Sequence, residues 1–130
     1  MADNKLYESK IDFCTKELSA KEKVSLKKGV NSLKLDECVK EGDVLTIDVD
    51  YAAKLDIHNE KNEKGEKNYS TYIIVDTDGQ KYSTSSNSFW DSFMDIFNEM
   101  SESDEEWQLE VLKKPSKNYA GKYFLTCDIR

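Results

Sequence analysis

The sequence has too few of several residue types to build the sites that those residues usually form. It contains one histidine, His58, and three widely spaced cysteines without a C-x-x-C pair, which argues against a zinc site and a disulfide framework. No serine or cysteine lies in a nucleophile motif such as G-x-S-x-G. We therefore expect a protein that is not an enzyme and that holds no metal or other cofactor.

Long apolar segments are also missing. No apolar run approaches the roughly 20 residues needed to cross a bilayer, and the first ten residues, MADNKLYESK, lack the hydrophobic segment of a signal peptide. The chain has 130 residues, one proline, five glycines and an apolar fraction of 38%, values typical of one globular domain. We expect a single cytoplasmic domain over residues 1–130 that does not contact a membrane.

Charge is distributed unevenly along the chain. The net charge is −7, yet residues 113–130 hold five cations against Asp128 alone, a local net charge of +4. Residues 69–112 hold one cation and ten carboxylates, a local net charge of −9. The overall charge disfavours nucleic acid as a partner, because its binding is driven largely by neutralising phosphates. The distribution nevertheless allows one face of the molecule to be positive.

A long strand is the clearest structural signal. Between residues 43 and 59, apolar side chains occupy every odd position: Leu45, Ile47, Val49, Tyr51, Ala53, Leu55 and Ile57. The even positions are mostly polar or small, so the alternation predicts a strand with one buried and one solvated face. We expect so long a strand to curve or change partners, and the small pair Ala52-Ala53 is the predicted place.

A hairpin is expected after this strand. Residues 59–68 contain no apolar side chain and indicate a solvated loop. Two strands are predicted at about 69–76 and 80–85, on either side of Asp78-Gly79. This dipeptide suits a two-residue hairpin turn, since Asp tolerates and Gly prefers positive φ.

A helix and two further strands complete the second half of the chain. Apolar residues recur at steps of three and four over about 89–100, which predicts a helix with Ser88 as its N-cap. Alternation of apolar and polar residues returns in residues 107–114, which predicts a strand that Pro115 should end. The same alternation in residues 123–129 predicts the last strand.

The first forty residues give weaker signals. Residues 6–13 suggest a short strand. Ser19 and Glu22 have the spacing of a capping box and precede a short helix that Gly29 would end. Residues 32–39 fit either another strand or a helical turn.

The order of these elements predicts the fold. Three strands, a helix and two more strands is the order of the five-stranded OB barrel, whose helix connects strands 3 and 4. We therefore expect a mainly β (α+β) fold with an OB-like barrel over residues 43–130. Residues 1–42 would add a strand and a helix as an N-terminal extension. An antiparallel sheet with one covering helix, not closed into a barrel, is the alternative.

Two segments resemble a known family. YSTYIIVDTDGQKYSTSSNSFWDSF, followed by LEVLKKPSKNYAGKYFLTC, is similar to the single-stranded DNA-binding proteins encoded by bacteriophages of Gram-positive hosts. The most specific piece is SKNYAGKYFLTC, and the resemblance covers roughly residues 43–130. It implies a non-catalytic protein that binds and protects single strands during phage DNA replication in the host cytoplasm, with replication proteins as further partners. This chain carries its acidic run internally at 102–106, whereas such proteins often end in an acidic tail.

The chemistry of this function needs cations for phosphates and flat rings on which bases stack. The segment 113–124 supplies both, and the predicted DNA-binding residues there are Lys113, Lys114, Lys117, Tyr119 and Lys122. Further candidates lie on the predicted long strand and hairpin: Lys54, His58, Tyr72, Lys81 and Tyr82. A solvated hairpin with its rings in the core is the plain structural explanation of the same cluster.

Other functions remain open at this point. A small protein-interaction module, or an acidic inhibitor of a host factor whose negative segment mimics DNA, would bind a protein and no oligonucleotide. A nucleotide-processing enzyme that holds Mg²⁺ with acidic pairs such as Asp48 and Asp50 is less consistent with the positions of these residues on the solvated side of a strand. The sequence does not distinguish a monomer from a homodimer, or a preference for DNA from one for RNA.

Overall fold

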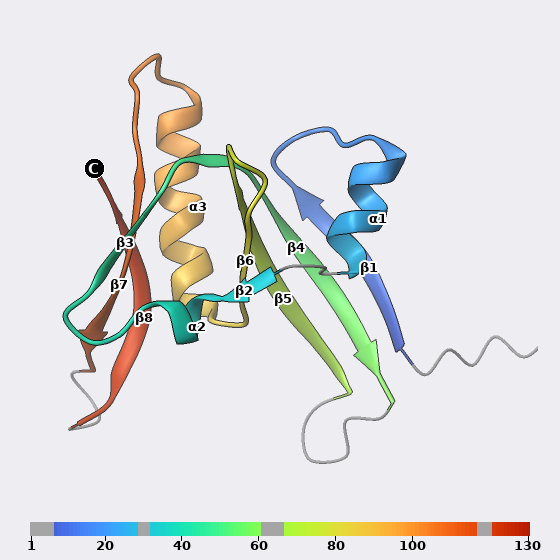
Figure 1. The fold of residues 1–130 in the computed structure, drawn as a ribbon, viewed down its shortest axis with the longest axis horizontal. Helices are drawn as coiled ribbons and strands as arrows, with labels where there is room; N and C mark the ends of the chain where they lie inside the picture. Colours follow the sequence, from blue (N-terminus) through green and yellow to red (C-terminus); the bar gives the residue numbers. More distant parts are fainter. Residues whose placement is uncertain (1–6, 29–31, 61–66, 117–120) are drawn as a thin grey trace, which may run out of the picture.

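The computed structural model describes residues 7–28, 32–60, 67–116 and 121–130, which form a mainly β fold with three helices (Figure 1). The elements in chain order are β1 (Tyr7–Cys14), α1 (Ala20–Lys28), β2 (Ser32–Lys34), α2 (Leu35–Cys38), β3 (Val44–Ile47), β4 (Val49–Asn59), β5 (Asn68–Asp76), β6 (Lys81–Thr84), α3 (Asn87–Ser101), β7 (Leu109–Pro115) and β8 (Tyr123–Ile129). A five-stranded sheet has the order β1-β4-β5-β6-β2, and a three-stranded sheet has the order β3-β7-β8.

The predicted long strand is present as β3 and β4, and it belongs to both sheets. β3 pairs with β7, whereas β4 pairs with β5 and β1. The change of partner falls at Asp48, so its predicted place at Ala52-Ala53 is wrong. The backbone carbonyl of Asp48 accepts a hydrogen bond from Thr77 N, and its side chain accepts one from Gln108 Nε2. Asp48 therefore ties the end of the β5–β6 hairpin to the start of β7.

A register shift just after Asp48 divides the odd positions of the strand between two hydrophobic cores. Pairing with β5 shifts between Val49 and Tyr51, so the odd positions on the two sides of the shift enter different cores. Ile47 joins a core with α3, whereas Tyr51, Leu55 and their odd neighbours join a second core with α1. The prediction of one continuous buried face is therefore wrong, although the strand itself is confirmed.

The first core lies between the two sheets and is filled mainly by α3 (Figure 1). Its buried members are Leu35, Val39, Ile47, Ala52, Tyr72, Ile74, Phe89, Trp90, Phe93, Leu109, Val111, Leu125 and Cys127. The second core lies on the other face of the five-stranded sheet, where Leu26 of α1 packs on β4 and β5. The middle of this sheet is thus buried on both faces, which explains the unbroken apolar run from Tyr72 to Val75.

The order of strands and helix along the chain that was predicted for residues 43–130 is confirmed, including the helix between β6 and β7. The described residues do not, however, close into a barrel. β6 pairs through its second edge with β2, in parallel, and that edge is therefore occupied. β8 is instead covered by α3, to which it is joined by Ser88 Oγ donating to Leu125 O and the Cys127 thiol donating to Phe89 O.

Local details correct two further predictions. The hairpin after β5 has three loop residues, 77–79, because Asp76 N donates to Gln80 O; Gly79 supplies the positive φ of +89°. The N-cap of α3 is Ser86, whose Oγ accepts from Phe89 N, and not Ser88. The capping box of α1 is confirmed by reciprocal hydrogen bonds between Ser19 and Glu22. Gly29 lies outside the described residues.

The remaining N-terminal predictions are confirmed in type. Of residues 6–13, the described residues 7–13 belong to β1, and residues 32–39 hold both a short strand, β2, and a helical turn, α2. In the part of the chain that the structure describes, no helix combines the length and the apolar character that a membrane span requires.

Leu26 provides a test of the second core, because it is the buried residue of α1 and has no exposed surface. We expect Leu26→Ala to lower the free energy of unfolding by about 2–5 kcal/mol, through lost burial and the cavity left behind. Val24→Ala, on the same helix at a position that is 54% exposed, should change it by less than about 0.5 kcal/mol. Urea denaturation measures both; equal effects would contradict the packing of α1 on the sheet.

Candidate nucleic-acid interface

The predicted basic hairpin is formed by β7 and β8. The two strands are antiparallel over their whole length, and Ser116 N donates to Lys122 O at the base of the loop. Lys117 and Tyr119, two of the predicted DNA-binding residues, lie outside the described residues. The site is therefore built from the residues on either side of that loop.

Cations and rings are both exposed at the tip of the described strands, which we call the hairpin end (Lys114, Pro115, Lys122, Tyr123 and Phe124). Lys114 lies directly opposite Phe124, so their side chains share the outer face of the three-stranded sheet. Phe124 is 40% exposed and Tyr123 is 43% exposed. Lys114 and Lys122 are exposed, and no ion pair joins them to a carboxylate among the described residues.

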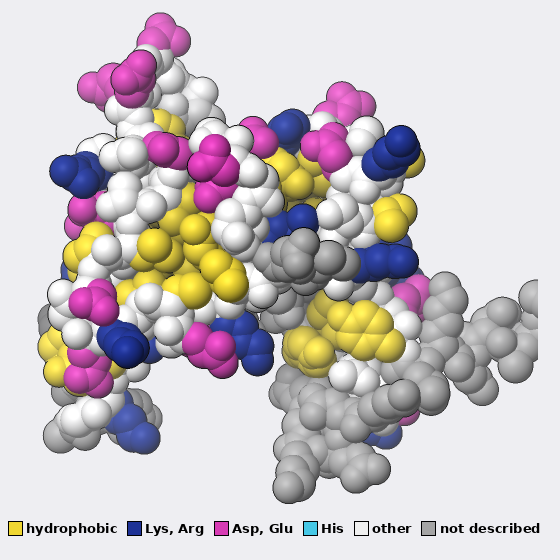
Figure 2. All heavy atoms as spheres, viewed as in Figure 1, with side chains coloured by type: hydrophobic (Ala, Val, Ile, Leu, Met, Phe, Trp, Pro, Cys, Tyr) yellow, Lys and Arg dark blue, Asp and Glu magenta, His cyan; other side chains and the backbone are white. Residues whose placement is uncertain are grey.

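Acidic residues limit how far this positive surface extends. β3 begins beside β7, with Val44 opposite Leu112, so Asp43 enters near the middle of the hairpin. Figure 2 accordingly shows both basic and acidic side chains at the end of the molecule to which β7 runs in Figure 1. The positive part is thus the stretch beyond Leu112 and not the whole hairpin.

Lys113 has a different role from the other hairpin lysines. It lies opposite Leu125, on the side of the sheet that faces the core, and it is half-buried. Its Nζ donates to the backbone carbonyl of Asp36 at 2.9 Å and so joins β7 to α2. Lys113 therefore has a structural contact that a phosphate would have to replace.

The predicted residues of the five-stranded sheet are not part of the hairpin end. Lys54 and His58 share one face of β4, as predicted, since they lie opposite Tyr72 and Asn68. Lys54 pairs with Asp12 at 3.4 Å, and His58 contacts Glu60 at 2.7 Å. Nearby carboxylates therefore already balance the charges of these two side chains, unlike those of Lys114 and Lys122 among the described residues.

Tyr72 is buried, and the expectation that it lines a groove is wrong. It is 5% exposed, its ring stacks on Trp90 with centroids 4.8 Å apart, and its hydroxyl donates to Asn87 Oδ1. Tyr82 is half-buried at the edge of the same core, where burial and then Asp76 raise its pKa. Lys81 points to the opposite face, because it lies opposite Val75 whereas Tyr82 lies opposite Ile74.

The His58 ring is held in a polar cluster at the end of β4. Nδ1 lies 2.7 Å from Asn68 Oδ1, and Nε2 lies 2.7 Å from Glu60 Oε1. The other carboxylate oxygen of Glu60, Oε2, accepts a hydrogen bond from Lys67 Nζ. Two acceptor oxygens are best satisfied by a ring with two N–H donors, which is the protonated form. The hydrogen bond to Asn68, followed by the contact with Glu60, accordingly raises the pKa of His58 above its ordinary value.

Two rings at the hairpin end were not among the predicted site residues. The alternation of residues 123–129 assigns Tyr123 to the buried side of β8, but the core ends at Leu125 and leaves Tyr123 beyond it. Phe124 falls on the outer side of the same alternation. The sequence did contain a signal for Phe124 as a site residue: it is a large ring at a position that the alternation predicts to be solvated.

Comparison of the chain with protein-family models, curated proteins and solved structures finds no match. Among the residues that the structure describes, no group of three or more His, Cys, Asp or Glu side chains is placed to hold a metal ion. The functional assignment below therefore depends on the hairpin end and on the resemblance given above.

The raised pKa of His58 can be measured directly, because the chain has no other histidine. An NMR titration of the ring should give a midpoint above about 6.5, the ordinary value. Its contribution to stability is then fully present below about pH 6.5 and is lost as the pH rises through the folded pKa. Asn68→Ala should lower the midpoint, since it removes the main cause. A midpoint at or below the ordinary value would contradict the two hydrogen bonds.

Proposed function

We propose that the chain binds single-stranded DNA, largely without sequence preference, through the hairpin end of β7 and β8. The observation that supports this most directly is the exposed cross-strand pair of Lys114 and Phe124, with Tyr123 at the start of β8 and Lys122 just before it. An ammonium group beside an exposed ring matches the repeating unit of a single strand, in which a phosphate alternates with a base.

The energies of these contacts are large enough for the proposed function. Stacking of a base on an aromatic side chain contributes about 1–3 kcal/mol, and it tolerates any base because every base has a flat face. Each lysine that neutralises a phosphate adds a salt-dependent contribution through counterion release. The acidic remainder of the chain, which brings the net charge of the whole to −7, restricts phosphate binding to this end of the molecule.

The fold is compatible with this function. We propose that β3–β4, β5, β6, β7 and β8 represent an opened OB-like arrangement in which α3 lies between the third and fourth strands. The loop between the last two strands is one of those that OB folds use to grip oligonucleotides. A non-catalytic role in phage DNA replication, in the host cytoplasm, follows from the resemblance in SKNYAGKYFLTC.

A protein-binding function is the second candidate. It is favoured by the acidic surface of α3 and the segment after it, which has no cation paired with it among the described residues. An acidic module of this kind would bind a basic protein surface and leave oligonucleotides free.

Fluorescence anisotropy with labelled oligo-dT tests the proposal. Phe124→Ala should weaken binding by about 1–3 kcal/mol, or roughly 5- to 150-fold, because one stacked base is lost. Lys114→Ala combined with Lys122→Ala should reduce the slope of log affinity against log salt by about 0.7 for each lost phosphate contact. Lys117→Ala combined with Tyr119→Ala, chosen from the sequence, should also weaken binding.

The matched control is Lys27→Ala combined with Lys28→Ala. These two exposed lysines lie on α1, so the variant makes the same change in net charge at a different place. It should retain the affinity of the unmodified chain. If the unmodified chain does not bind oligo-dT at low salt, or if the control loses as much affinity as the hairpin variants, the proposed interface is wrong.

A further inference from the structure

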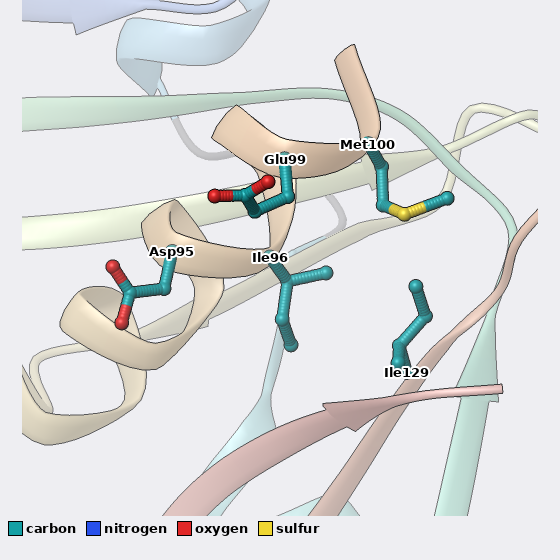
Figure 3. Close-up of a pocket in the computed structure, with 5 residues that line it drawn as sticks. All are labelled: Asp95, Ile96, Glu99, Met100 and Ile129. Carbon is teal, nitrogen blue, oxygen red and sulfur yellow. The ribbon is translucent and has the colours of Figure 1, made fainter. Parts of the chain in front are cut away.

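An open apolar pocket lies at the end of the molecule opposite the hairpin end. Ile96 and Met100 of α3 form it together with Ile129 of β8, and its volume is about 460 Å³. Figure 3 shows these three side chains around a common space, whereas the carboxylates of Asp95 and Glu99 point to the other side of the helix, away from that space. The pocket therefore has an apolar floor, and two negative charges lie on the adjoining face of α3.

The charges around this pocket are unfavourable for the helix that carries them. Asp91, Asp95 and Glu99 follow one another at intervals of four residues, which places like charges next to each other on one face. Glu99 also lies near the C-terminus of α3, where the helix dipole favours cations, and the last turn has no basic residue. The described residues provide no ion pair for these carboxylates. A bound cation would relieve both effects.

The same molecule presents the complementary surface. At the hairpin end, Phe124 and Lys114 place an exposed ring side by side with an ammonium group that has no ion pair among the described residues. A ring fits an apolar floor that contains a methionine, with which aromatic rings make favourable contacts. The ammonium group fits a pair of carboxylates one helical turn apart.

These two surfaces cannot meet within one molecule. Phe124 and Ile129 both belong to β8, five positions apart, and an extended strand separates them by roughly 17 Å. The strand is held rigidly by β7 on one side and α3 on the other. Only the hairpin end of a second molecule can reach the pocket.

We infer that copies of this chain associate head to tail, with Phe124 of one molecule in the Ile96–Met100–Ile129 pocket of the next and Lys114 beside Asp95 and Glu99. Such a contact joins different surfaces on the two molecules and leaves one of each free, so it forms open chains and not only dimers. The pocket is small compared with a stable interface, so the association is weak and reversible.

Sedimentation equilibrium of the full chain tests the inference without DNA. At about 0.05 M salt, the weight-average mass should exceed 15.0 kDa and rise with protein concentration; at about 1 M salt, where charges are screened beyond roughly 3 Å, it should return to 15.0 kDa. A mass of 15.0 kDa at low salt, even at the highest concentration, would overturn the inference.

Paired variants identify the two surfaces. A pocket variant, Asp95→Lys with Glu99→Lys, and a hairpin variant, Lys114→Ala with Phe124→Ala, should each be monomeric alone. Mixed, they should form a one-to-one complex, because the intact hairpin of the first fits the intact pocket of the second. No complex on mixing, with both variants folded by circular dichroism, would contradict a head-to-tail contact.

A control with the same change in charge is Glu17→Lys with Asp78→Lys, at two exposed positions that neither line the pocket nor belong to the hairpin end. It should associate like the unmodified chain. Loss of association in this control would show that overall charge is the cause and would overturn the pocket assignment.

This inference does not depend on DNA binding, which oligo-dT anisotropy measures separately. Where both occur, oligo-dT should dissociate the chains, since the two partners use the same hairpin residues.

Discussion

Stacked aromatic rings between the two sheets are the interaction on which the rest of the structure depends. Tyr72 of β5 stacks on Trp90, Trp90 on Phe93, and Phe93 on Phe97, with ring centroids 4.8, 5.5 and 5.8 Å apart. This column fixes α3 against the five-stranded sheet. The same helix contacts β8 through the bond from the Cys127 thiol to Phe89 O. The position of the hairpin end relative to the rest of the molecule therefore follows from the packing of one helix.

Separation of charge along the β7–β8 sheet links the two proposals. One end has exposed cations and rings, and the other has an apolar pocket with uncompensated carboxylates. Figure 2 shows acidic side chains gathered at the tip where α3 ends in Figure 1. Under the two proposals, DNA binds at the first end and a cationic surface binds at the second. Competition between the two ligands for Lys114 and Phe124 would couple self-association to DNA binding.

The candidate site shows where prediction from sequence stops. The cluster of lysines at residues 113–122 is evident in the sequence, because local charge needs no knowledge of the fold. Whether each lysine is available is not evident, since Lys113 is held by a carbonyl 77 positions away in the chain. The burial of Tyr72 likewise depends on Trp90, which reaches it through the packing of α3. Phe124 became a candidate only when its exposure was known.

The sequence by itself determined the order and type of most elements, the capping box of α1 and the division of charge along the chain. These features depend on residues close together in the chain, whose spacing sets the period and whose side chains cap their own backbone. Only the tertiary structure decided that β3 and β4 divide at Asp48, that β2 occupies the edge of β6, and that both faces of β5 are buried. Those outcomes depend on pairing and packing between distant segments, which compete for the same edges and faces, and local patterns do not rank the competitors.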